Sequence, residues 1–318
     1  MPTHTAVLDL AAGFVTDGGL ETDLIFHHGV DLPEFASFPL LDDPAGRARL
    51  RDYYDGYATI AAGAGVGLLL ESPTWRANTD WGAKLGYDQS ALDRVNVDAM
   101  RFLAALGARW ADQVPQLRLV GMVGPRGDGY RASAAEPAEA AAYHLPQVRA
   151  LARGGAELIS GYTLTGVGEA AGLALAVAEV GLPAMIAFTV ETDGRLPDGT
   201  GLAAAIEAVD AICPPAYFGI NCAHPTHIAA GLDDSPALAR IAVLRSNASE
   251  LSHAELDEAE ELDDGDPVAL AGSVTDLRPL LPGLRVVGGC CGTDARHVAA
   301  MWSSGAVVPA APAIGATN

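Results

Sequence analysis

Short, almost continuously hydrophobic runs recur along the chain, most of them ending at small or polar residues. Eight such runs are present, and each has about the length of a β-strand. Continuous hydrophobicity, rather than alternation, is typical of parallel strands that are covered on both faces. The pattern therefore predicts eight buried parallel strands, at 14–17, 67–71, 119–124, 157–163, 184–190, 218–222, 241–246 and 285–289.

Between these runs, apolar residues recur at helical spacings. Strand alternating with helix eight times predicts an α/β fold, a single (β/α)8 TIM barrel over residues 1–302, with a loosely ordered tail at 303–318. An open doubly wound sheet is the alternative, but the first turn, TDGGLET at 16–22, lacks its phosphate-binding GxGxxG pattern. Helices are predicted at 49–63, 90–107, 136–154, 168–181, 200–211, 267–281 and 294–302.

Composition narrows the class of protein. Half of the residues are hydrophobic, which is incompatible with a disordered acidic chain. There are 40 acidic and 19 basic residues, a net charge of −21, which argues against nucleic-acid and membrane partners because both are bound through Lys and Arg. We find no apolar run of membrane-spanning length, and no basic segment of the kind that opens a signal peptide. These features predict a cytoplasmic protein that acts on small molecules, as a monomer or a homo-oligomer.

Three of the four cysteines stand at predicted strand ends. Cys222 closes the sixth strand, and Cys290 and Cys291 follow the eighth. The carboxyl ends of barrel strands gather around one mouth, where active sites lie. Three sulfur ligands suit zinc and leave a fourth position open, as in catalytic zinc sites. A set of buried core cysteines is the alternative, and it is our interpretation of Cys213 at a helix end.

Glycines surround the vicinal cysteine pair. Gly288 and Gly289 precede it and Gly292 follows it. Successive residues of a regular strand point to opposite faces of the sheet. We therefore expect these glycines to let the backbone turn so that both cysteines face one ion.

These motifs together resemble the homocysteine S-methyltransferase family. The resemblance rests on VGGCCGT at 287–293, GINC at 219–222 and DGG at 17–19, and it extends from Asp17 to about Met301. Members of the family are (β/α)8 barrels that bind zinc through three such cysteines. The resemblance implies that Cys222, Cys290 and Cys291 are the Zn²⁺ ligands and the catalytic centre.

The resemblance also implies the chemistry. A zinc-bound thiol is deprotonated and becomes a good nucleophile. The expected acceptor is homocysteine, which would give methionine as in methionine biosynthesis. Because the chain has room for the barrel alone, the expected donor is a small onium compound, S-methylmethionine or S-adenosylmethionine. Betaine as donor, and another thiol or a selenol as acceptor, remain alternatives.

Other strand ends supply candidate substrate-binding groups. Asp17 offers a carboxylate to an ammonium group, and Trp75 offers a π face to a sulfonium cation. Asn221 precedes a ligand and is expected to orient its neighbours. The full candidate set is Asp17, Gly18, Gly19, Glu21, Thr74, Trp75, Tyr162, Thr163, Glu191 and Asn221.

One position departs from the family pattern. The family usually carries Glu-Thr after the fourth strand, where the Glu helps to bind the amino-acid substrate, and this chain has Tyr162 and Thr163. That contact is either missing or supplied by another carboxylate, such as Glu21 or Glu191. The identity of the acceptor thiol is therefore open.

Two other classes of function remain as alternatives. A zinc hydrolase would favour His and carboxylate ligands, and the HxH and HExxH motifs are absent. A metal-binding or thiol-sensing barrel that catalyses no reaction would need only the cysteines. His224 precedes a proline and is expected to cap a helix rather than bind metal, and His227 and His297 are expected on helix surfaces.

Overall fold

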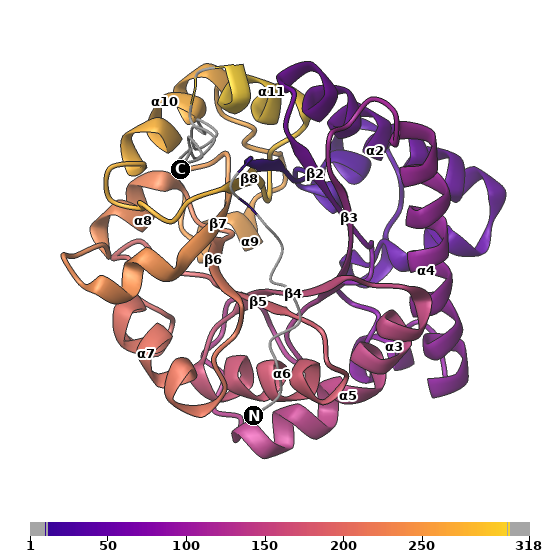
Figure 1. Cartoon of the computed structure of the whole chain (residues 1–318), viewed down its shortest axis with the longest axis horizontal. Coiled ribbons are helices and arrows are strands. Elements are labelled where there is room, and N and C mark those ends of the chain that lie inside the picture. Colours follow the sequence, from indigo (N-terminus) through magenta and orange to yellow (C-terminus); the bar gives the residue numbers. More distant parts are fainter. Residues whose placement is uncertain (1–9, 11, 304, 306–318) are drawn as a thin grey trace, which may run out of the picture.

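A closed barrel forms the centre of the molecule. The computed structural model describes residue 10, residues 12–303 and residue 305. Within these residues, eight strands pair in parallel and in chain order, and the last pairs with the first. Figure 1 shows the helices as a ring outside the strands. The predicted (β/α)8 barrel is confirmed, and all of the predicted tail except residues 303 and 305 lies outside the described residues.

The strands coincide with the predicted hydrophobic runs to within a few residues. β1 is the shortest, and its two residues pair with β2 on one side and β8 on the other. The strands are β1 (Phe14–Val15), β2 (Gly67–Glu71), β3 (Leu117–Val123), β4 (Leu158–Leu164), β5 (Ala184–Phe188), β6 (Tyr217–Asn221), β7 (Ile241–Ser246) and β8 (Val286–Gly289).

All seven predicted helices are present, and their ends are set by local chemistry. The first long helix starts five residues earlier than predicted, because the Asp43 side chain accepts hydrogen bonds from the amides of Ala45 and Gly46. It ends at Gly65, which is left-handed. The longer helices are α2 (Pro44–Ala64), α4 (Gln89–Trp110), α5 (Pro137–Gly154), α6 (Val167–Glu179), α7 (Leu202–Ile212), α10 (Pro267–Leu277) and α11 (Ala295–Ser303).

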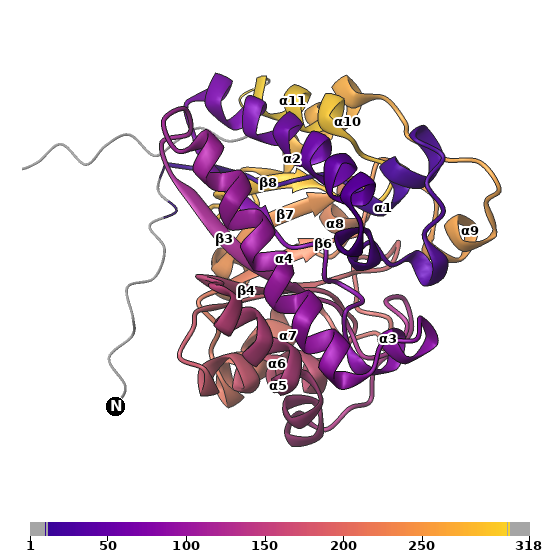
Figure 2. The same cartoon turned by 90° about the vertical axis from the view of Figure 1, so that its right-hand side faces the viewer.

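Shorter elements lie in the loops. Figure 2 shows α1, α3 and α9 toward one end of the barrel. They follow β1, β2 and β7, so this is the end where the strands terminate. The short elements are α1 (Leu20–Thr22), α3 (Thr79–Lys84), α8 (Pro225–Ala230), α9 (His253–Glu258), a π-helical turn η1 (Asp23–His27) and the 3₁₀ turns η2 (Pro33–Phe35), η3 (Phe38–Asp42) and η4 (Pro236–Arg240).

The core has two layers, and strand parity assigns residues to them. In β2, Leu68 and Leu70 pack outward against the helices, whereas Leu69 packs inside the barrel. Inward positions of the other strands fill the same interior, including Phe14, Val120, Leu158, Met185, Val243 and Val286. Because side chains fill the barrel, ligands have room only at its mouth. No helix in the described part of the chain combines the length and the hydrophobicity that crossing a membrane requires.

Candidate active site and metal centre

A cavity opens at the mouth of the barrel. Thr74 and Glu191 do not line it. Thr74 is buried and donates its hydroxyl to the Met122 carbonyl oxygen, at 2.7 Å. The other predicted site residues do line the cavity, namely Asp17, Gly18, Gly19, Glu21, Trp75, Tyr162, Thr163, Asn221, Cys222, Cys290 and Cys291.

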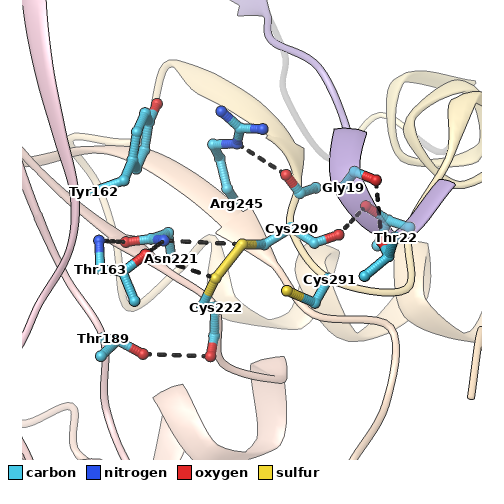
Figure 3. Close-up of a disulfide and its surroundings, with 12 residues drawn as sticks. Gly19, Thr22, Tyr162, Thr163, Thr189, Asn221, Cys222, Arg245, Cys290 and Cys291 are labelled. Carbon is cyan, nitrogen blue, oxygen red and sulfur yellow. Dashed lines mark hydrogen bonds between the residues drawn. A yellow bond between two sulfur atoms is a disulfide. The ribbon is translucent and has the colours of Figure 1, made fainter. Parts of the chain in front are cut away.

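The three cysteines of the predicted metal site come together (Figure 3). The Sγ atoms of Cys222, Cys290 and Cys291 all lie within 4.8 Å of one another. Cys222 and Cys290 are joined by a disulfide bond, with Cα atoms 5.3 Å apart, and Cys291 is free. The sequence did not predict this bond. Cys213 is also a free cysteine, outside the cavity lining, and burial raises the pKa of its thiol.

Two unusual backbone conformations place the sulfur atoms. Thr163 and Cys222 have φ angles of 60° and 55°, in the left-handed region that non-glycine residues avoid. Each costs about 1–3 kcal/mol unless its surroundings hold it. The Asn221 side chain provides that support, because its Oδ1 accepts from the Thr163 amide at 2.8 Å and its Nδ2 donates to Thr163 Oγ1 at 2.9 Å. One amide therefore ties β6 to β4 beside the cysteines.

A close approach and a turn complete the placement of the vicinal pair. A Cβ atom on Gly19 would collide with the carbonyl oxygen of Cys290, so the first loop can lie against the cysteines only with glycine there. Gly292 has a φ angle of 77°, which glycine adopts at no steric cost. The predicted role of Gly292 in turning the backbone agrees with this geometry.

Each sulfur atom has a polar hydrogen nearby. Asn221 Nδ2 lies 3.8 Å from Cys290 Sγ, the Tyr130 hydroxyl 3.8 Å from Cys291 Sγ, and the Thr163 hydroxyl 3.9 Å from Cys222 Sγ. Donors in these positions favour the thiolate over the thiol. Burial has the larger effect at Cys291 and raises the pKa of its thiol to about 11. The Cys291 sulfur therefore needs a cation beside it to be anionic at neutral pH.

An aromatic pair lies over the cysteines and was not predicted. The ring of Tyr130 stacks on that of His253, with centroids 4.1 Å apart. His253 Nε2 donates to the carbonyl oxygen of Cys222 at 2.6 Å, and Nδ1 lies 3.1 Å from Glu191 Oε1. Glu191 thus contacts His253, which in turn binds the backbone of Cys222, and Glu191 is not part of the cavity wall.

A buried ion cluster lies beneath the cavity. Arg245 Nη1 lies 2.6 Å from Glu71 Oε2, and Nη2 lies 2.6 Å from Asp17 Oδ1. Side chains alternate between the two faces of a strand. Glu71 and Arg245 each stand two residues beyond an inward-facing core residue, so both side chains point into the barrel and meet there. Burial raises the pKa of Asp17 to about 7, although Arg245 acts in the opposite direction. Two carboxylates therefore share one guanidinium in a nearly dry environment.

The same guanidinium fastens two backbone segments. Arg245 donates to the carbonyl oxygens of Gly18 and Gly289, each at 2.8 Å. Gly18 belongs to the first loop of the cavity, and Gly289 immediately precedes Cys290. Arg245 thus fixes the loop after β1 relative to the end of β8, next to Cys290.

Comparison with known proteins identifies the family of this chain. A family model described as "Homocysteine S-methyltransferase" matches residues 14–304, nearly the whole chain. The chain belongs to the homocysteine S-methyltransferase family. It is therefore an S-methyltransferase, and its substrates are small molecules.

Solved structures support the same fold. The homocysteine methyltransferase MmuM from Escherichia coli is 22% identical in its oxidized form, with 94% of this chain and 98% of that chain covered and a TM-score of 0.72. Its metallated form is 22% identical, covers 92% and 96% of the two chains, and has a TM-score of 0.69. At this identity, the likeness establishes the barrel alone.

The departure from the homocysteine S-methyltransferase pattern also has a structural setting. The hydroxyl of Tyr162 donates to the Glu71 carboxylate, 2.9 Å from each oxygen, and the Arg245 guanidinium lies 4.9 Å from the Tyr162 ring centroid. Tyr162 is thus part of the buried ion cluster. It offers the cavity an aromatic wall in place of a carboxylate.

Of the histidine predictions, the structure confirms one and contradicts another. His224 Nδ1 accepts from the Thr226 amide at 3.3 Å and caps α8, as predicted. The surface prediction for His297 is wrong, because its side chain is fully buried and Nε2 donates to the Asp264 carbonyl oxygen at 2.8 Å. α11 presents His297 on its inner face, among Val298 and Met301.

Asn221→Ala is expected to lower the free energy of unfolding by about 2 kcal/mol, because two buried hydrogen bonds to Thr163 are lost. It should also lower kcat, since Thr163 and Cys222 lose the support of their left-handed conformations. Urea denaturation and initial rates measure the two effects.

Asn96→Ala is the matched control. Asn96 is buried in α4 and donates to the carbonyl oxygens of Ala77 and Leu92, both at 2.9 Å. It should cost similar stability and leave the turnover of the folded enzyme unchanged. Equal turnover in Asn221→Ala and Asn96→Ala would show that Asn221 has no special relation to the cysteines.

Proposed function

We propose that this chain is a zinc-dependent methyltransferase that moves a methyl group from a small onium donor, S-methylmethionine or S-adenosylmethionine, to homocysteine, giving methionine. The observation that carries the proposal is the group of three sulfur atoms within 4.8 Å of one another at the cavity. Family membership and a relative solved in a metallated form support it. The expected setting is the cytoplasm, where thiols stay reduced.

The donor set suits zinc. Cys222, Cys290 and Cys291 offer three sulfurs, which is the ligand count of a tetrahedral site with one open position. Binding requires Cys222 and Cys290 as thiolates, so the disulfide and the metal exclude each other. When bound, zinc would lower the pKa of the acceptor thiol so that its thiolate is present at neutral pH.

The chain's own aromatic residues suit a cationic donor. Phe35, Trp75, Tyr130 and Tyr162 all line the cavity. Their rings present π faces to the cavity, and π faces attract an onium group. These rings would therefore favour a sulfonium donor over a neutral one at this cavity.

Elimination among the candidate carboxylates favours Glu21 as the partner of the acceptor's ammonium group. Asp17 is held by Arg245 and by the Tyr53 hydroxyl, at 3.2 Å, and Glu191 pairs with His253. Glu21 lines the cavity, and only its Oε1 is engaged among the described residues, accepting from the Ser37 hydroxyl at 2.7 Å. We propose that the other oxygen, Oε2, accepts the ammonium hydrogen bond.

A direct assay tests the function. The reduced, zinc-loaded protein is offered S-methylmethionine, S-adenosylmethionine or betaine with a panel of thiols, and products are identified by mass spectrometry. Methionine formed from S-methylmethionine and homocysteine is the expected result. Protein that binds zinc but transfers no methyl group across the panel would contradict the proposal and favour a sensing role.

Glu21→Gln is expected to raise the KM for homocysteine about 10- to 100-fold, because a hydrogen bond between two charged groups is lost. The KM for 4-mercaptobutanoate, which lacks the ammonium group, should stay within twofold. Steady-state kinetics with both thiols gives the comparison.

Glu34→Gln serves as the control, since Glu34 is an exposed carboxylate that pairs with Lys84 at 3.1 Å. Burial raises the pKa of Glu21, so its charge is lost as the pH falls through that raised value. The KM for homocysteine should therefore rise toward low pH more steeply in the wild type than in Glu21→Gln. Parallel pH profiles would refute the role of Glu21.

A further inference from the structure

Arg76 lies in the loop between β2 and α3 and is not itself a cavity-lining residue. Its guanidinium carbon lies 3.7 Å from the ring centroid of Trp81 and 4.9 Å from that of Trp75. Trp75 is itself a cavity-lining residue. Two indole rings therefore hold a cation, and one of these rings belongs to the wall of the cavity.

This cation lacks a counter-ion in the described part of the chain. No described carboxylate lies within 4.0 Å of the half-buried guanidinium, and its Nε is buried without a hydrogen-bond partner. Burial lowers the pKa of Arg76, against the attraction of Glu21, Glu34 and Asp128. Other half-buried arginines without a paired carboxylate, such as Arg47, Arg118 and Arg285, donate to backbone carbonyl oxygens, whereas Arg76 has no hydrogen bond to any described residue.

We infer that Arg76 binds the α-carboxylate of an amino-acid substrate. The inference rests on the proposed function, in which Glu21 holds the α-ammonium group. Glu21 and Arg76 carry opposite charges that attract each other, and no ion pair joins them; this is the charge arrangement that a zwitterion with an ammonium and a carboxylate group would complement. A guanidinium fork also matches a carboxylate with two parallel hydrogen bonds.

The two tryptophans explain why arginine suits this position. Stacking against Trp81 and Trp75 fixes the plane of the guanidinium before the ligand arrives, which reduces the entropy cost of binding. Partial burial strengthens the attraction for a carboxylate, because water screens it less. Arg76 therefore favours substrates that carry a carboxylate over thiols and onium compounds that lack one.

The binding test uses a pair of ligands that differ only in the carboxylate. L-methionine and 3-(methylthio)propylamine are titrated into the reduced, zinc-loaded enzyme by calorimetry. The wild type is expected to bind methionine more tightly. Arg76→Gln should weaken the binding of methionine about 10- to 100-fold and leave the affinity for 3-(methylthio)propylamine unchanged. Arg76→Lys keeps the positive charge but not the planar guanidinium. Its affinity for methionine should lie between those of the wild type and Arg76→Gln.

Lys84→Gln is the matched control, because Lys84 Nζ lies 3.9 Å from the centroid of the same Trp81 ring yet pairs with Glu34. It should leave both affinities unchanged. If the wild type does not discriminate between the two ligands, or if Arg76→Gln weakens both equally, the inference is overturned.

Kinetics then separates the two sources of the carboxylate. If Arg76→Gln raises the KM for homocysteine but not the KM for 3-mercaptopropylamine, Arg76 binds the carboxylate of the acceptor. An effect on S-methylmethionine but not on trimethylsulfonium assigns it to the donor. If the wild type transfers no methyl group to any thiol, the proposed function fails, while the binding test still decides on Arg76.

Discussion

Cys290→Ala is expected to abolish tight zinc binding and to lower kcat/KM about 10³-fold or more, since one of three metal ligands is lost. A free thiol with a pKa near 8.5 is mostly protonated at neutral pH, so the acceptor would lose its nucleophilic form. Metal content per chain, measured by mass spectrometry on reduced protein, and initial rates of methionine formation check both effects.

Cys213→Ala is the control for this change. Cys213 is a free, half-buried cysteine that follows α7 and takes no part in the cavity. Its replacement should leave one zinc per chain and wild-type turnover. A Cys290→Ala protein that kept both metal and activity would refute the three-cysteine site.

The barrel could be predicted because its signal is local. Each strand is buried on both faces, so its hydrophobicity is nearly continuous and its ends are marked by polar residues. The cysteine cluster was predictable for a related reason, since barrel topology brings strand ends together at one mouth. The Cys222–Cys290 disulfide was not, because it depends on how closely β6 and β8 approach.

The buried ion cluster shows what the sequence conceals. Glu71 and Arg245 are 174 residues apart, and each ends or interrupts an apolar run that reads as an ordinary strand. A charged residue inside a buried run requires a partner, which is a signal in itself. Both residues occupy inward-facing positions of their strands, and this alternation could have predicted that their side chains meet inside the barrel. The stacked rings of Tyr130 and His253 gave no comparable signal, since Tyr130 lies in a loop and His253 begins the short helix α9.

Arg245→Met is expected to lower the free energy of unfolding by about 3–5 kcal/mol at neutral pH, because it leaves the buried carboxylates of Glu71 and Asp17 without their cation. It also removes the hydrogen bonds to the carbonyl oxygens of Gly18 and Gly289, so zinc affinity should fall as well. Urea denaturation and zinc titration measure the two losses.

The pH dependence of this loss has a definite sign. Burial already raises the pKa of Asp17 to about 7, and removing Arg245 takes away the attraction that opposes the rise. A carboxyl group with a raised folded-state pKa destabilises the protein as it ionises, so the penalty grows as the pH rises and shrinks as the pH falls. The loss in Arg245→Met should therefore be smaller at pH 5 than at pH 8.

Two further variants decide whether buried charge is the cause. Arg240→Met removes a partly exposed arginine paired with Asp210 and should cost no more than about 1 kcal/mol. Adding Glu71→Gln to Arg245→Met should restore part of the lost stability, because the uncompensated charge at that position disappears. If the double variant were less stable than Arg245→Met at neutral pH, and the loss did not depend on pH, packing rather than charge would explain why Arg245 is there.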